Sequence, residues 1–177
     1  ITYWDGINLI GFDTGPGNAL MDDYMLNIFN QNFDRDGNIA AKGKPIESEI
    51  KKFLQHEFFK TYPPKSLDRN EFSFQYNELI KKKYSVNNIM ATLAEFTIET
   101  ITRSFQLLPK KIKSIIITGG GCRNVHLMNR LKDKLRLPIY NEKQLGINFD
   151  YIESELIAYL SARSIYNLPF TFPSTTG

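Results

Sequence analysis

The sequence predicts an α/β protein that folds as one domain over residues 1–177, with helices flanking a mixed sheet. Three observations carry this prediction. The chain has 177 residues, 42% hydrophobic and 23% charged with both signs mixed, so it can bury a core and does not read as disordered. Several segments repeat apolar residues at helical spacing. Their order is hairpin, helices, strand, helix, strand, helix, which is typical of layered α/β packing.

The first half opens with a predicted hairpin. Asp5-Gly6 lies between the β-prone segments 1–4 and 8–12, and glycine accepts the positive φ of a tight turn. Apolar residues then recur at helical spacing, so we expect helices over residues 19–29 and 46–59.

The middle of the chain contains one ambiguous segment and the clearest helix. Phe72, Phe74 and Tyr76 alternate as in a strand, yet we favour a short helix over residues 72–84. Residues 87–108 carry an apolar stripe at spacings of three to five and predict a long helix that Pro109 ends.

The last third predicts two strands and two helices. The β-branched run 114–118 is typical of a strand buried on both faces, and residues 137–140 predict a further strand. A helix is expected between them. The final helix is expected over residues 150–166, and its inward residues are listed here: Ile152, Leu156, Tyr159 and Leu160.

Composition excludes several classes of protein. The single cysteine, Cys122, excludes an internal disulfide framework and a cysteine-rich metal site. No apolar run approaches the roughly 18 residues of a membrane-spanning helix, so no membrane partner is expected. The formal charge is +3 and the basic residues form no continuous stripe, so no nucleic-acid partner is expected. His56 and His126 have no companion at metal-ligand spacing, and no metal site is predicted.

Two glycine-rich loops are candidates for chemistry. Gly119, Gly120 and Gly121 lie between a predicted strand and a helix, where a backbone without Cβ atoms can approach a phosphate and the helix offers free N–H groups. A turn that serves packing alone is an equally good interpretation. Asp13 ends a predicted strand just before Thr14 and Gly15, and it could act as a base or hold Mg²⁺ through water. A simple turn cap is again an equal alternative.

Other polar residues give weaker signals. Asp22 and Asp23 are expected to be capping or surface charges. Cys122 has no nearby histidine in sequence and is expected to be only a small side chain beside the loop. Glu153 and Glu155 lie on the last predicted helix, and periodicity does not choose between them.

The motifs resemble those of the anhydro-N-acetylmuramic acid kinases. The most specific is Gly11–Asn18, followed by Leu20-Met21-Asp22. The other matching landmarks fall in order along the chain: Tyr62–Ser66 with Arg69 and Phe72, Ala91-Thr92-Leu93, Gly119–Gly121 with Asn124, Leu127-Met128, Glu153, Ala158, Leu160, Ala162-Arg163, Leu168-Pro169, Pro173-Ser174 and Thr176-Gly177.

This resemblance implies a ribonuclease-H-like lobe of the sugar kinase, Hsp70 and actin superfold. It implies a bacterial cytoplasmic enzyme of cell-wall (peptidoglycan) recycling that uses ATP and Mg²⁺ to turn 1,6-anhydro-N-acetylmuramic acid and water into N-acetylmuramic acid 6-phosphate. Asp13 would be the base that activates water, beside Thr14 and Gly15 on the substrate side. Gly119, Gly120, Gly121 and Asn124 would contact the nucleotide, and Glu153 would contact the sugar.

The sequence also departs from that family. The family is about twice as long, so the resemblance implies a C-terminal lobe whose partners are an N-terminal lobe, the sugar substrate and a second subunit in a homodimer. Leu67-Asp68 stands where Thr-Gly is usual, and Cys122-Arg123 replaces Ala and a variable residue. A catalytically inert fragment with weak nucleotide binding is the alternative, and a kinase of another sugar is a third hypothesis.

Overall fold

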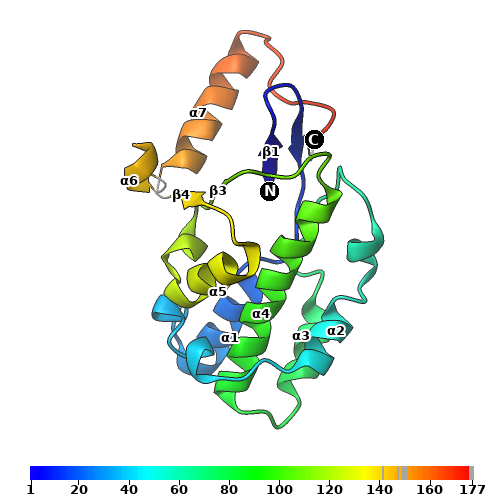
Figure 1. Ribbon diagram of the computed structural model, residues 1–177, viewed down its shortest axis with the longest axis vertical. Helices are drawn as coiled ribbons and strands as arrows, with labels where there is room; N and C mark the ends of the chain where they lie inside the picture. Colours follow the sequence, from blue (N-terminus) through cyan, green and yellow to red (C-terminus); the bar gives the residue numbers. More distant parts are fainter. Residues whose placement is uncertain (141, 147, 149–150, 176–177) are drawn as a thin grey trace.

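The computed structural model describes residues 1–140, 142–146, 148 and 151–175. Figure 1 shows a helical body around the long helix α4, with a strand hairpin and helix α7 at the other end. The strands are β1 (Thr2–Trp4), β2 (Leu9–Gly11), β3 (Ile115–Ile116) and β4 (Ile139–Tyr140). The α-helices are α1 (Ala19–Phe29), α2 (Glu47–Phe53), α3 (Ser73–Ile80), α4 (Val86–Ser104), α5 (Val125–Leu135), α6 (Glu142–Leu145) and α7 (Ile152–Ile165). Short 3₁₀ turns cover Arg35–Gly37, Ala40–Lys42, Glu57–Lys60, Phe105–Leu107 and Gly120–Arg123.

The predicted hairpin is confirmed. β1 and β2 pair antiparallel, with Tyr3 opposite Ile10. The Asp5 carboxylate accepts the N–H groups of Ile7 at 3.0 Å and Asn8 at 2.8 Å, and Gly6 has φ 93°. The turn is therefore closed by its own residues, as local turn chemistry requires.

Helix α4 forms the centre of the body. Ser85 caps its first turn by accepting the N–H of Asn88, and the helix buries nearly every residue from Ile89 to Ile98. The predicted helix over 87–108 is confirmed, although its last turn tightens into a 3₁₀ turn after Ser104. A helix buried on most faces must be surrounded, and α1, α2, α5 and the Ala40–Lys42 turn contact it.

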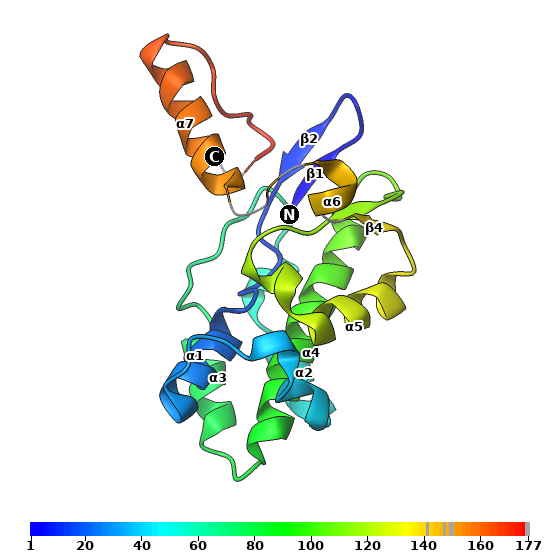
Figure 2. The ribbon, with the colours of Figure 1, turned by 90° about the vertical axis from the view of Figure 1, so that its left-hand side faces the viewer.

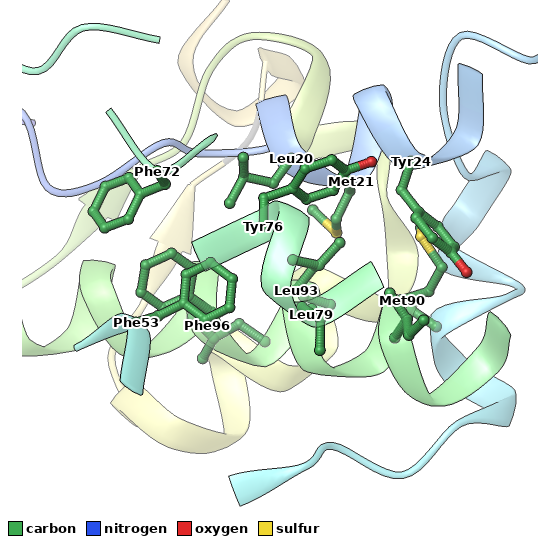
Figure 3. Packing of buried hydrophobic residues seen from close by; sticks show 14 of the residues in the cluster. Leu20, Met21, Tyr24, Phe53, Phe72, Tyr76, Leu79, Met90, Leu93 and Phe96 are labelled. Atoms are coloured by element: carbon green, nitrogen blue, oxygen red, sulfur yellow. The ribbon is translucent and has the colours of Figure 1, made fainter. Parts of the chain in front are cut away.

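An aromatic cluster fills the core beside α4 (Figure 3). The rings of Phe53 and Phe96 lie 4.7 Å apart, and Phe72 packs edge-on against Phe96 at 5.4 Å. Phe59 completes the cluster at 5.9 Å from Phe96. Tilted and edge-to-face arrangements at these separations are the favoured ones for aromatic rings.

The single helix predicted over 46–59 is wrong. α2 ends at Phe53, and a separate 3₁₀ turn starts at Glu57, where His56 Nδ1 accepts the N–H of Phe58 at 3.2 Å. A continuous helix would turn Phe58 about 140° away from Phe53. The break lets both rings reach the core, so burial decides against helix continuity.

The short helix favoured over 72–84 is confirmed as α3, which ends at Ile80. The inward side of the last predicted helix is wrong. α7 buries none of its residues, and Leu156 and Tyr159 are 51% and 57% exposed. Figures 1 and 2 show why, because α7 stands apart from the body formed by α1 to α5.

The expected mixed sheet and its buried central strand are also wrong for the residues that the structure describes. These form two separate sheets of two strands each, β1 with β2 and β3 with β4. β3 is only two residues long, and Ile116 is 53% exposed. Parallel pairing of β3 with β4 covers only one edge of β3. The coarser prediction, an α/β protein with helices and small sheets, is confirmed.

No helix within the described ranges is both long enough and apolar enough to cross a lipid bilayer.

Replacement of the central phenylalanine tests the core. Phe96→Ala should lower the free energy of unfolding by about 3–5 kcal/mol, because a 1% exposed ring leaves a cavity among three other rings. Urea denaturation followed by circular dichroism measures the change. Phe74→Ala is the matched control, since Phe74 is 74% exposed and its loss should change stability by less than about 0.5 kcal/mol.

Candidate functional site

Asp13 follows β2 and is fixed by a distant segment of the chain. Its N–H donates to the carbonyl of Lys65 at 3.0 Å, and its Oδ2 accepts the N–H of Leu67 at 2.8 Å. The carboxylate does accept a backbone hydrogen bond, as the turn-cap interpretation expects. The donor lies 54 residues away, however, so the bond orients Asp13 between two segments and does not close its own turn.

The loop after Asp13 lies directly on α4. Thr97 Oγ1 donates to the carbonyl of Gly17 at 2.7 Å. A Cβ atom at Gly15 would stand 2.8 Å from Thr100 Oγ1, closer than real Cβ contacts allow. Glycine at position 15 is therefore required by close approach to the helix, and this contact fixes Thr14 and Gly15 in place.

The second glycine loop touches the first. Gly119 has φ 79°, and Cβ atoms built at Gly119 and Gly120 would meet nothing within 4 Å. At Gly121 a Cβ would lie 3.0 Å from Asn18 Nδ2, so the two loops meet where Asn18 approaches Gly121. The outer part of the second loop presents bare backbone to the surroundings, as a backbone that approaches a ligand must.

Asn124 starts helix α5. Its Oδ1 accepts the N–H of Leu127 at 3.0 Å, and the residue is 9% exposed. This is a helix N-cap, which aims the positive end of α5 at the glycine loop. The backbone of Gly37 lies so close to the same oxygen that a Cβ at position 37 would stand only 2.4 Å from Asn124 Oδ1. The loop and the helix terminus are thus held in one position.

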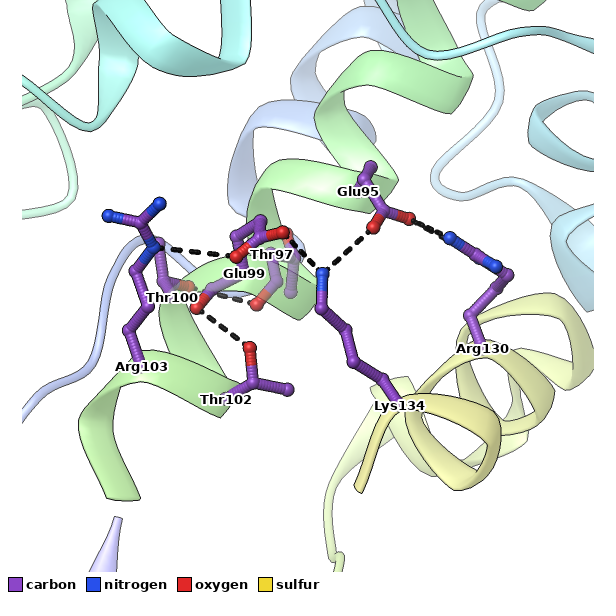
Figure 4. A network of polar contacts seen from close by, with 8 residues as sticks. All are labelled: Glu95, Thr97, Glu99, Thr100, Thr102, Arg103, Arg130 and Lys134. Atoms are coloured by element: carbon purple, nitrogen blue, oxygen red, sulfur yellow. Dashed lines mark hydrogen bonds and ion pairs between the residues drawn. The ribbon is translucent and has the colours of Figure 1, made fainter. Parts of the chain in front are cut away.

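Ion pairs attach α5 to α4 (Figure 4). Glu95, a buried residue of α4, contacts Arg130 at 2.8 Å and Lys134 at 3.1 Å, and Lys134 also pairs with Glu99. Arg130 pairs with the buried Glu95 carboxylate, because a buried charge without a partner would destabilise the fold. Both glycine loops are consequently positioned by the same helix.

A pocket of about 400 Å³ opens where the two loops meet, within the usual size range of small-molecule sites. Its lining residues are Asn18, Met21, Asp22, Asn32, Phe33, Asp34, Arg35, Asp36, Gly120, Arg123 and Asn124. Asp34 is buried but already accepts the N–H groups of Ile39 and Ala40, so its role is to shape the turn.

Asp22 is a site residue that sequence reasoning missed. It was expected to be a capping or surface charge, yet it lines the pocket. Burial raises its pKa to about 6, the nearby Arg69 opposes the shift, and Asp23 adds to it. The signal that could have found it is spacing, because residues 18 and 22 lie four apart and share one face of α1.

The structure brings some predicted residues together and leaves others apart. Asp13, Thr14 and Gly15 share one loop, and Gly119, Gly120, Gly121 and Asn124 share the other. Glu153 lies exposed in the first turn of α7, and within the described residues no hydrogen bond or ion pair joins it to Asp13 or to either loop. The functional role of each of these residues stays a prediction.

The sequence profile of anhydro-N-acetylmuramic acid kinase matches residues 4–177. The chain belongs to the anhydro-N-acetylmuramic acid kinase family. A relative of that name from Rhodopseudomonas palustris (strain BisB18) is 44% identical over 179 residues, which cover 100% of this chain and 48% of the relative. Relatives of the same name from Nitrobacter winogradskyi and Zymomonas mobilis are 42% and 37% identical and are covered to 48% and 46%. The chain thus spans about half the length of the curated relatives it matches.

The lining residues and volume of the pocket can be compared with the nucleotide and Mg²⁺ that the family implies. Bare backbone at Gly120, the N-terminus of α5 and a volume of about 400 Å³ fit part of a nucleotide. Within the described ranges no group of three or more His, Cys, Asp or Glu residues could hold a metal ion. Mg²⁺ is commonly held by one or two carboxylates together with substrate phosphates, so the residues present are compatible with it only when a nucleotide is bound.

The pKa of Asp22 makes stability depend on pH. The folded-state pKa of about 6 lies above the ordinary 3.8, so the folded chain binds more protons between pH 4 and 6 and its stability falls as pH rises through that range. Asp22→Asn should therefore raise the free energy of unfolding by about 1 kcal/mol at pH 7.5, after solvent screening of a half-exposed group, and change little at pH 4. Urea denaturation at both pH values measures this, and an equal effect at both would contradict it.

Proposed function

We propose that this chain is the C-terminal, ribonuclease-H-like lobe of a two-lobed kinase. The complete enzyme would use ATP to convert 1,6-anhydro-N-acetylmuramic acid and water into N-acetylmuramic acid 6-phosphate. Membership of the family supports the chemistry. The observation that carries the proposal is the junction of the two glycine loops, with a fixed carboxylate on one loop and an open backbone on the other.

Asp13 is the general base of this proposal. Asp13 takes a proton from water as the water oxygen bonds to the anomeric carbon, and the bond from that carbon to the bridging 6-oxygen breaks. The freed 6-oxygen accepts the γ-phosphoryl group, and ADP leaves. Oδ2 of Asp13 is held by the Leu67 N–H, so the carboxylate is oriented before substrate arrives. Thr14 and Gly15 would contact the substrate beside it.

The nucleotide is assigned to the second loop and the adjoining pocket. ATP supplies the phosphoryl group when bound. The N–H groups of Gly119, Gly120 and Gly121 and the N-terminus of α5, capped by Asn124, would face its phosphates. Asp22 and Asn18 line the same pocket and would contact the remainder of the nucleotide.

The sites would be complete only with the N-terminal lobe. The chain spans about half the length of its relatives, so the second side of both ligand sites would come from the remaining half. Glu153, exposed in the first turn of α7, would reach the sugar in that assembly. We propose a homodimer in the bacterial cytoplasm, where peptidoglycan fragments and ATP meet.

Replacement of the base tests the reaction. Asp13→Asn in the complete protein should reduce formation of N-acetylmuramic acid 6-phosphate by at least about 1000-fold, because no group then accepts the water proton. Nucleotide affinity, measured by calorimetry, should stay within about twofold. Asp133→Asn is the matched control, since Asp133 is an exposed acid on α5 and its loss should leave turnover unchanged. Near-normal turnover of Asp13→Asn would contradict the assignment of Asp13 as the general base.

Replacement of Gly120 tests ATP binding without disturbing the fold. A methyl group at Gly120 meets nothing within 4 Å, so Gly120→Ala should leave the melting temperature unchanged within about 2 °C. If phosphates approach that backbone, the same methyl group should weaken ATP binding in the complete protein about tenfold or more. Unchanged ATP affinity would show that the nucleotide lies elsewhere. Absence of turnover when an N-terminal half is added to this chain would favour the inert fragment.

A further inference from the structure

The chain segment that orients Asp13 is held in place by a side chain of its own. Asp13 donates its N–H to the carbonyl of Lys65 at 3.0 Å and accepts the N–H of Leu67 at 2.8 Å. Residues 61–68 form neither helix nor strand, so regular secondary structure does not fix these two backbone groups. A contact that fixes this segment therefore also fixes the Asp13 carboxylate.

The side chain of Lys65 makes such a contact. Its Nζ donates to the carbonyl of Phe58 at 3.0 Å and lies 4.2 Å from the centre of the Phe58 ring. An ammonium over an aromatic face is attracted by the electrons of the ring, and more strongly where water is partly excluded. Thr61 Oγ1 donates to the same carbonyl at 2.8 Å, so two side chains of the following segment converge on Phe58.

Phe58 is itself fixed by the core. It is 9% exposed, and its ring packs edge-on against Phe59 at a centroid separation of 5.3 Å. Phe59 belongs to the aromatic cluster beside α4 and lies 5.9 Å from Phe96. Contacts thus run without a break from the aromatic cluster through Phe58 and Lys65 to Asp13.

Lys65 contacts the core and not the carboxylate. Within the part of the chain that the structure describes, no hydrogen bond or ion pair joins its ammonium to Asp13. Burial lowers the pKa of Lys65, so its charge is partly withdrawn from water, and the Phe58 carbonyl and ring compensate for that loss of solvation. Any effect of Lys65 on the carboxylate is therefore carried by the backbone of residues 65–67.

We propose that Lys65 is a positioning residue, which holds the segment at residues 65–67 and through it the carboxylate of Asp13. The inference rests on the proposed role of Asp13 as general base and adds a residue that acts through it. A misplacement of about 1 Å can cost a catalytic group roughly 100-fold in rate. Loss of the Lys65 contact should therefore slow the reaction and leave the binding of both ligands as it is.

Substitution of Lys65 in the complete protein tests the effect on the reaction. Lys65→Met keeps the length of the side chain without its charge, and it should lower kcat about tenfold or more while each KM stays within about twofold. Lys65→Arg keeps a cation and N–H donors and should retain kcat within about threefold. Lys60→Met is the matched control, because Lys60 is an exposed lysine of the adjoining 3₁₀ turn that pairs with exposed Glu57, and its loss should leave kcat unchanged.

Amide hydrogen exchange, followed by NMR, measures the same contact without substrate. In Lys65→Met the Leu67 amide, which donates to Asp13, should exchange about tenfold or more faster than in the unsubstituted protein. The Leu127 amide is the internal control, since it also donates to a side-chain oxygen, that of Asn124 at 3.0 Å, and it should keep its rate. Equal acceleration of both amides would show a general loosening of the fold and would overturn the proposal.

A double variant shows whether Lys65 acts through Asp13. Asp13→Asn removes the proposed base, so the addition of Lys65→Met should lower kcat by less than about a further twofold. A further tenfold loss would overturn the proposal, as would an unchanged kcat or an unchanged Leu67 exchange rate in Lys65→Met alone. Near-normal turnover of Asp13→Asn marks instead a failure of the proposed base, and the Leu67 amide then decides by itself whether Lys65 holds the segment.

Discussion

Burial of helix α4 on nearly all sides is the constraint on which the other elements depend. Other segments attach their backbone to this helix through its polar side chains, and a threonine can do so while also bonding within its own helix. Thr92 accepts the N–H of Ile46 at 3.0 Å while donating to its own helix at 2.6 Å, and Thr97 holds the loop at Gly17. Glu95 holds α5 by charge. One rigid helix thereby sets the separation of both glycine loops, which is the arrangement a precise site needs.

The features predicted correctly are those whose cause is local in the sequence. Asp5 and Gly6 close the hairpin with neighbours two and three residues away, and the bounds of α1 follow from spacing alone. Residue type alone selects Asp13 and the glycines as candidates, and their roles stay predictions. The contact between Thr97 and Gly17 joins residues 80 positions apart, so no local pattern reveals it. The break after Phe53 has the same origin, because it serves a ring cluster built from distant segments.

The wrong predictions share a second cause. The sequence pattern of β3 and α7 describes elements covered on more than one side, yet in this chain β3 has an open edge and α7 has no buried residue. The apolar residues exposed along and after α7 are Leu156, Ile157, Tyr159, Ile165, Tyr166, Leu168, Phe170 and Phe172. Exposed apolar residues that lie together on a surface are typical of an interaction site. Apolar patterning therefore does not by itself show that a residue is buried within these 177 residues.

The contact between Ser174 and β2 has a consequence for how the chain folds. Ser174 Oγ donates to the carbonyl of Leu9, 165 residues earlier, so this contact closes almost the whole chain into a loop. Closing a loop of that length costs more entropy than closing any hairpin, and such contacts form late and open early. Until Ser174 docks against β2, the outer edge of β2 is unpaired, and an unpaired strand edge is a template for pairing with another molecule. The segment around Ser174 thus covers a strand edge that would otherwise be open to pairing with another molecule.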